Sequence, residues 1–218
     1  MFYDMINSAL GLESSRIIGL EALVACLAVF LLTVLATRLI LPVLRAKKLN
    51  QPINMYVTEH AGKSGTPTMG GLIFLISVIV TSCIYMKDYP QIIPILFVTV
   101  GYGVIGFLDD YIKIVLKRSE GLTPSQKMFG QIIVTGVFAI YMYKFSGISM
   151  EMIVPFFPNV TLDLGFLTIP VMFLAIIGTV NGVNFTDGLD GLATSVTSVV
   201  GIFFIFCGIV LESDVAVF

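Results

Sequence analysis

The segment Ile92–Lys117 reads IIPILFVTVGYGVIGFLDDYIKIVLK. It carries no charged residue from Ile92 to Leu108, and Asp109 and Asp110 follow at once. A helix that crosses about 30 Å of hydrocarbon needs around 20 mostly apolar residues. The segment therefore predicts a membrane-spanning helix that ends in a pair of carboxylates at one surface of the bilayer.

The composition of the whole chain agrees with this interpretation. Of its 218 residues, 57% are apolar types and 12% are charged, and the mean hydropathy is +0.99. An ordinary soluble domain has roughly 25% charged residues. The composition excludes a water-soluble globule and a disordered chain, and a net charge of −2 does not fit a nucleic-acid-binding protein. Since His60 is the single histidine, a histidine-rich metal site is excluded too.

The apolar segments predict the fold class. Six of them are long enough to span a bilayer, or nearly so. They are Ala22–Leu44, Met69–Met86, Ile92–Leu108, Met128–Tyr143, Leu164–Thr186 and Gly191–Leu211. We expect an all-α polytopic membrane bundle of about six transmembrane helices, forming one membrane-embedded domain over residues 1–218. Between the fourth and fifth segments, two short β-prone runs flank Pro155–Asn159 and predict a small hairpin, although an irregular loop explains them nearly as well.

The distribution of lysine and arginine predicts the orientation, because positive residues gather in cytoplasmic loops. Eight of them lie near the loops after the first and third helices: Arg45, Lys47, Lys48, Lys63, Lys113, Lys117, Arg118 and Lys127. We expect these loops to be cytoplasmic and the N-terminus and any hairpin to be extracytoplasmic.

Asp109 and Asp110 then lie at the inner end of the third helix. Capping does not explain them, because carboxylates favour the opposite end of a helix. Lys113 is within pairing reach of both if the helix continues. The two acids are either a solvated pair balanced by Lys113, or a Mg²⁺ ligand together with a general base or nucleophile. We favour the second reading, since an acid costs roughly 2.5–3.5 kcal/mol at the centre of a membrane helix.

A second polar group ends the fifth helix on the same side. Asn181, Asn184 and Asp187 recur every three residues, near one face of a helix. Two amides and an acid are costly against lipid, so they must face a polar cleft or bond to another helix. We favour the cleft, with Asp187 adding a third carboxylate for a cation.

The turn that follows this helix is rich in glycine. Gly188 and Gly191 permit a tight turn with free backbone N–H groups, as in an anion nest. Asp190 fits an N-cap of the sixth helix better than it fits a site, so it is the weaker candidate here.

Two further segments predict phosphate contacts at the inner side. Lys63–Gly71, KSGTPTMGG, leads into the second helix, whose N-terminus beside Lys63 suits a phosphate, although a capped helix with a topology lysine explains it equally well. Thr123 to Gln126 form a capping box that places Lys127 in the first turn of the fourth helix. The sites together offer carboxylates that suit a cation, and amides and lysines that suit phosphates. This combination predicts metal-assisted phosphoryl transfer.

Three motifs carry a family resemblance: GTPTMGG at Gly65–Gly71, FLDDYIK at Phe107–Lys113 and NGVNFTDGLDGLA at Asn181–Ala193. Together they resemble the bacterial phospho-N-acetylmuramoyl-pentapeptide transferases (MraY), within the polyprenyl-phosphate N-acetylhexosamine-1-phosphate transferase superfamily. The resemblance implies an enzyme of peptidoglycan synthesis in the inner membrane. It would transfer phospho-N-acetylmuramoyl-pentapeptide from UDP to undecaprenyl phosphate, forming lipid I and UMP with Mg²⁺. It also implies a homodimer.

The resemblance assigns roles to the residues already singled out. Asp109, Asp110 and Asp187 would serve the catalytic centre and the metal, with Lys113 and Asn184 beside them. The residues implied on the substrate side are Lys63, Thr68, Lys127, Asn181, Gly188, Leu189 and Asp190. Members of the family continue through further helices that carry another aspartate and a histidine-rich loop, so we expect this chain to be the N-terminal portion of a longer fold.

Three alternatives stay open at this point. A related transferase of N-acetylglucosamine phosphate is one, although Thr68 favours the muramoyl branch. A membrane transporter is the second, and a non-catalytic fragment is the third.

Overall fold

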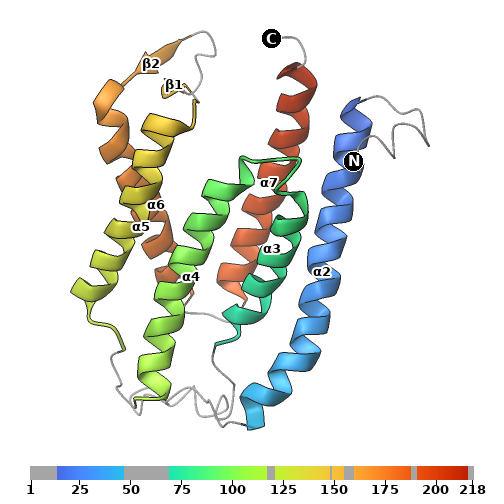
Figure 1. Ribbon diagram of the computed structural model, residues 1–218, viewed down its shortest axis with the longest axis vertical. Coiled ribbons are helices and arrows are strands. Elements are labelled where there is room, and N and C mark those ends of the chain that lie inside the picture. Colours follow the sequence, from blue (N-terminus) through green and yellow to red (C-terminus); the bar gives the residue numbers. More distant parts are fainter. Residues whose placement is uncertain are drawn as a thin grey trace.

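A computed structural model of the protein describes residues 14–46, 69–116, 121–147, 149–154, 160–187 and 191–215. Helices dominate these ranges (Figure 1). They are α2 (Ser14–Ala46), α3 (Gly71–Tyr85), α4 (Ile92–Ile114), α5 (Pro124–Phe145), α6 (Thr168–Thr186) and α7 (Leu192–Val215). A 3-10 turn, η2 (Gly165–Leu167), and two strands, β1 (Glu151–Ile153) and β2 (Thr161–Asp163), lie between α5 and α6.

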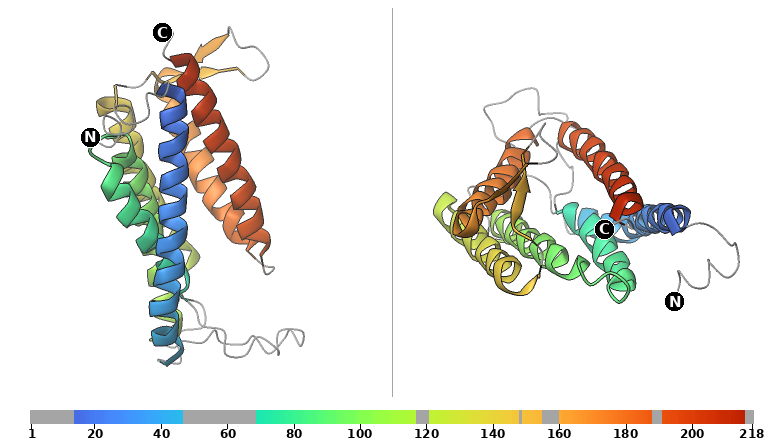
Figure 2. Two further views of the ribbon diagram at one scale, coloured as in Figure 1. Left: turned by 90° about the vertical axis from the view of Figure 1, so that its right-hand side faces the viewer. Right: turned by 90° about the horizontal axis from the view of Figure 1, so that it is seen from above.

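The helices form an arc in which neighbours in sequence are neighbours in space. α2 packs against α3, α3 against α4, α4 against α5, and α5 against α6. Seen from above, α7 lies between α2 and α6 and contacts both (Figure 2). The prediction of an all-α bundle is confirmed.

The length and surface of the helices fit a membrane. Within the described ranges, Leu23–Ala46, Ile92–Ile114, Pro124–Phe145 and Gly165–Thr186 are long and apolar enough to span it, and Gly71–Tyr85 and Leu192–Phe206 are shorter apolar helices. Large apolar side chains such as Phe30, Phe129 and Leu174 are exposed. In a water-soluble protein such side chains are mostly buried, whereas here they form a surface that suits contact with lipid. The polytopic membrane class is confirmed.

The interior is held together by polar contacts between helices. The hydroxyls of Tyr102 in α4 and Thr135 in α5 lie 2.8 Å apart, and Thr135 is completely buried. Gln131 in α5 is 1% exposed and exchanges two hydrogen bonds with Asn181 in α6, at 2.9 and 3.4 Å. Because lipid offers no competing water, satisfied pairs of this kind hold membrane helices in a defined relative position.

The predicted hairpin is confirmed. β1 and β2 pair antiparallel, with Glu151 opposite Asp163 and Ile153 opposite Thr161. The side chain of Asp163 then accepts a hydrogen bond from the backbone N–H of Gly165, at 2.8 Å, which leads the chain into η2. The hairpin lies at the end of the bundle where α5 ends and α6 begins, away from the end of α4 (Figure 1).

Helix ends differ from the expected spans. α4 continues past Leu108 to Ile114, so Asp109 and Asp110 lie inside the helix rather than after it. α2 begins at Ser14, before the expected Ala22. Hydropathy marks the apolar part of a helix, whereas backbone hydrogen bonds continue into polar residues at either end.

Candidate active site

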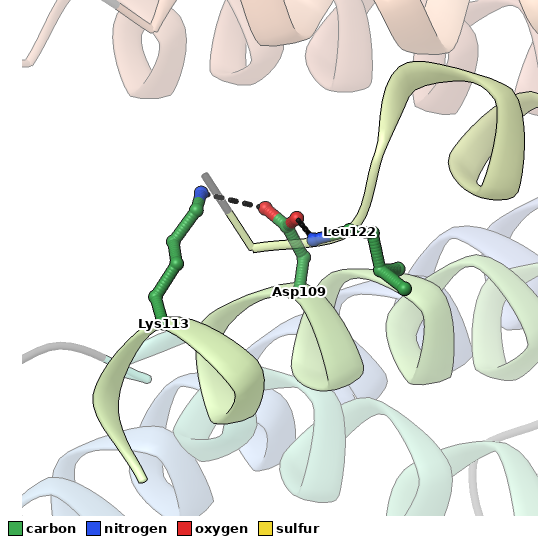
Figure 3. Close-up of polar contacts among 3 residues, drawn as sticks. All are labelled: Asp109, Lys113 and Leu122. Atoms are coloured by element: carbon green, nitrogen blue, oxygen red, sulfur yellow. Dashed lines mark hydrogen bonds and ion pairs between the residues drawn. The ribbon is translucent and has the colours of Figure 1, made fainter. Parts of the chain in front are cut away.

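The last turns of α4 hold the first part of the site. Asp109 is 8% exposed, and its Oδ2 lies 2.7 Å from Lys113 Nζ. Its Oδ1 accepts a hydrogen bond from the backbone N–H of Leu122 at 2.9 Å (Figure 3). The expected pairing of Asp109 with Lys113 is confirmed. The contact with Leu122 adds a tie between α4 and the segment that precedes α5.

The start of α5 places a second lysine nearby. Thr123 Oγ1 accepts a hydrogen bond from the backbone N–H of Gln126, at 3.3 Å, and Gln126 Oε1 accepts one from the backbone N–H of Thr123, at 3.0 Å. With Pro124 in the first turn, the predicted capping box is confirmed. The cap fixes where α5 begins and so places Lys127 in its first turn.

Asp110 differs from its neighbour. It is less buried than Asp109, and its carboxylate interacts with the backbone amide of Met69, just before α3. Met69 is itself buried and has a φ of +65°, a conformation that is rare for a residue with a side chain. The backbone amide before α3 thus approaches Asp110, while the amide before α5 is bonded to Asp109.

The end of α6 supplies the third part. Asn184 and Asp187 are exposed. The backbone N–H of Asp187 donates a hydrogen bond to the carbonyl of Val183, and α6 ends there. Asn181 lies deeper and is bonded to Gln131, so it is Asn181 that makes the interhelical contact.

These three parts meet at one cavity of about 660 Å³ between α3, α4, α5 and α6. The polar side chains predicted for the site that line it are Asp109, Asp110, Lys113, Lys127, Asn184 and Asp187. An adjoining cavity of about 630 Å³ shares four of these residues and adds Gln131 and Asn181. The fold thus brings together residues as far apart in the chain as Asp109 and Asp187.

Other predicted positions lie outside the described residues: Lys63, Thr68, Gly188, Leu189 and Asp190. Among the residues that are described, no three or more of the acids, cysteines and histidines are grouped closely enough to hold a metal. Asp109, Asp110 and Asp187 therefore do not form a ready three-carboxylate centre.

Gln131 and the backbone of residues 121–122 were not predicted as part of this region. Gln131 had a signal in the sequence, because an amide inside an apolar helix must find a partner. The Leu122 N–H had none, since every residue except proline carries one.

Comparison with known protein families shows which family the chain belongs to. The model of glycosyl transferase family 4 matches residues 92–218, which include α4 to α7. The chain belongs to glycosyl transferase family 4. Within this family, a signature of phospho-N-acetylmuramoyl-pentapeptide transferases matches residues 63–75, where α3 begins.

Individual relatives point the same way. A phospho-N-acetylmuramoyl-pentapeptide-transferase of Bacillus subtilis is 42% identical over 164 residues, which make up 72% of this chain and 50% of the relative. Proteins of the same name from Acetivibrio thermocellus and a Geobacillus species are 46% and 39% identical, over 59% and 72% of this chain and 38% and 50% of their own lengths. The chain spans about half the length of the curated relatives it matches. The resemblance to this branch of glycosyl transferase family 4 is confirmed.

Proposed function

We propose that the protein transfers phospho-N-acetylmuramoyl-pentapeptide from UDP to undecaprenyl phosphate, forming lipid I and UMP. In this reaction an oxygen of the lipid phosphate bonds to the phosphorus attached to the sugar. The bond from that phosphorus to UMP breaks, and UMP leaves with the electron pair. The proposal rests on the similarity to enzymes of this name and on the cavity that carboxylates, an amide and lysines line together.

The cavity suits two phosphate-bearing substrates. Lys113 and Lys127 line both it and its neighbour, so their ammonium groups are available to phosphate oxygens. Asn184 adds an amide donor on the opposite helix. Apolar residues of α3, such as Leu72 and Phe74, line the other side, where a polyprenyl chain could approach from the lipid.

The donor set also fits Mg²⁺, which prefers carboxylate oxygens and commonly uses one or two carboxylates together with waters and substrate phosphates. Asp110 and Asp187 would hold it, because both line the cavity. Asp109 is the least available of the three predicted ligands, since both of its oxygens already accept hydrogen bonds. The bound ion would neutralise charge on the diphosphate.

Asp110 is also the carboxylate that we assign to the lipid phosphate. In this role it accepts the proton of the phosphate or orients the attacking oxygen. In a second, covalent route the Asp110 carboxylate bonds to the phosphorus attached to the sugar while UMP leaves, and the lipid phosphate then displaces the carboxylate. Trapping of phospho-N-acetylmuramoyl-pentapeptide on Asp110 in a single turnover would identify this route.

The test compares two acids at opposite ends of the bundle. In the intact protein, Asp110→Asn should lower UMP release from UDP-N-acetylmuramoyl-pentapeptide and undecaprenyl phosphate by about 10³-fold, as loss of a general base does. Asp88→Asn, in the exposed turn between α3 and α4, is the control and should leave the rate unchanged. Near-normal turnover by folded Asp110→Asn would remove this residue from the mechanism.

The same assay separates the remaining alternatives. If UDP-N-acetylglucosamine replaces the muramoyl donor with equal or higher efficiency, the protein belongs functionally to the related transferases. The match at residues 63–75 favours the muramoyl donor. Coupled uptake of a solute into proteoliposomes without UMP release would favour a transporter.

The proposal includes an orientation and an assembly. The cavity would open to the cytoplasm, with the β1–β2 hairpin outside, as the distribution of positive residues predicts. Labelling of cysteines introduced at Thr161 and Ser125 with an impermeant reagent tests this, because only the first should react in intact cells. Light scattering in detergent tests the homodimer that the family resemblance implies.

A further inference from the structure

Gly121 occupies a position where a side chain would collide with its neighbours. Its φ is +63°, a left-handed conformation that side chains disfavour. A Cβ at this position would lie 2.5 Å from Asp109 Oδ1, 2.7 Å from Lys113 Cε and 3.0 Å from the backbone oxygen of Asp109. Since Cβ atoms essentially never come closer than 3.0 Å to a heavy atom of a residue elsewhere in the chain, any substitution must displace the Asp109–Lys113 pair or the backbone around Gly121.

The space that Gly121 leaves free is filled by a carboxylate with two partners. Asp109 bonds to Lys113 with one oxygen and to the Leu122 N–H with the other. Figure 3 shows the carboxylate between the lysine on its own helix and the backbone that leads to α5. The last turns of α4 and the approach to α5 therefore meet at one buried acid.

We propose that Gly121 is a positioning residue: by leaving room for the Asp109 carboxylate, it holds the Lys113 ammonium at the cavity. The inference rests on the proposed transferase function, in which Lys113 contacts a phosphate. A side chain at residue 121 pushes the carboxylate away and carries Lys113 with it. A displacement of this kind, about 1 Å, commonly lowers an enzyme's rate by up to roughly 10²-fold.

A purely conformational role makes a different prediction, and the chain offers a matched control. Gly147, just after α5, has a φ of +67°, but a Cβ there would meet no atom within 4 Å. Gly147→Ala therefore imposes a similar backbone strain without the collision. Comparison of the two alanine variants separates the effect of φ from the effect of the Asp109–Lys113 contact.

The first experiment measures turnover in the intact protein with UDP-N-acetylmuramoyl-pentapeptide and undecaprenyl phosphate. Gly121→Ala should lower kcat by roughly 10- to 100-fold with little change in the KM for the lipid. Gly147→Ala should stay within about twofold of the unaltered protein. In a Lys113→Met background, Gly121→Ala should reduce kcat by less than twofold further, because both changes remove the same interaction. Full additivity of the two losses, or normal kcat in folded Gly121→Ala, overturns the proposal.

The second experiment uses thermal unfolding alone and does not depend on activity. Gly121→Ala should lower the melting temperature more than Gly147→Ala does, and Asp109→Ala should recover part of that loss by removing the colliding oxygen. If Gly121→Ala does not fold, folding of the double variant supports the contact, and failure of the double variant to fold overturns it. If the unaltered protein releases no UMP, the proposed function fails, while this measurement still decides whether Gly121 makes room for Asp109.

Discussion

The two ends of the helix bundle are built in different ways. At the cavity end, formed by the end of α4, the start of α5 and the end of α6, side chains make the contacts, as Asp109 of α4 does with the backbone N–H of Leu122 before α5. At the hairpin end, formed by the α3–α4 turn and β1–β2, backbone groups bond mainly to one another, as the N–H of Asp88 does to the carbonyl of Tyr85. A backbone contact survives most substitutions, whereas a side-chain contact depends on residue type. The cavity end should therefore be sensitive to mutation and the hairpin end tolerant.

The largest difference should appear between the two lysines of α5. Lys127 lies in its first turn and lines the cavity, while Lys144 lies in its last turn at the hairpin end. Under the proposed function, Lys127→Ala should lower the rate of UMP release by roughly 10²-fold, because the cavity loses a positive charge assigned to the substrate phosphates. Lys144→Ala should leave it unchanged. Equal rates for both variants would contradict the assignment of Lys127 to the cavity.

The next largest effect concerns stability. Gln131→Leu removes both hydrogen bonds between Gln131 and Asn181 and should lower the free energy of unfolding by about 1 kcal/mol. The half-buried Asn181 then keeps only the bond that its side chain donates to the carbonyl of Ile177, at 2.8 Å. Chemical denaturation in detergent measures this. Gln131→Leu combined with Asn181→Leu should be closer in stability to the unaltered protein than Gln131→Leu alone, since no unpaired polar group remains. A double variant that loses as much as both single variants together would show that the two amides do not act as a pair.

The helix cap at the start of α5 predicts an effect of similar size. Thr123→Ala removes the hydroxyl that accepts from Gln126 and should lower the free energy of unfolding by about 1 kcal/mol. Ser125→Ala, at an exposed position in the same turn, should change it by less than about 0.5 kcal/mol. Thermal unfolding of the two variants side by side checks the difference.

The smallest effect is predicted for the hairpin. Glu151 and Asp163 lie directly opposite one another, and like charges in this arrangement repel. Glu151→Lys should therefore raise the free energy of unfolding, by about 0.2–1 kcal/mol, without changing turnover. A loss of activity in this variant would show that the hairpin end takes part in the reaction after all.

Much of the fold was predictable from hydropathy, because lipid imposes a simple rule on sequence. A long uncharged run such as Ile92–Leu108 has few alternatives to a spanning helix. The capping box at Thr123 and the pairing of Asp109 with Lys113 were also predictable, since both depend on short spacings within the chain.

The architecture of the site was predictable only in part. That Asp110 and Asp187 lie at the same end follows from counting helices, but their common cavity depends on how α4 and α6 pack. The different surroundings of Asp109 and Asp110 depend on backbone amides at Leu122 and Met69, which no residue type reveals. The role of Gly121 has the same origin, because a glycine in a loop usually indicates only a turn.

The exchange of two hydrogen bonds between Gln131 and Asn181 also limits how α5 and α6 can slide. Two amide side chains on neighbouring helices can form both hydrogen bonds at only one position of one helix along the other. When the chain length of the surrounding lipids changes, the bundle must respond by tilting as a unit, or by deforming the bilayer, instead of shifting these helices lengthwise. The depth of the cavity below the membrane surface would then vary with lipid thickness, while its internal shape is preserved.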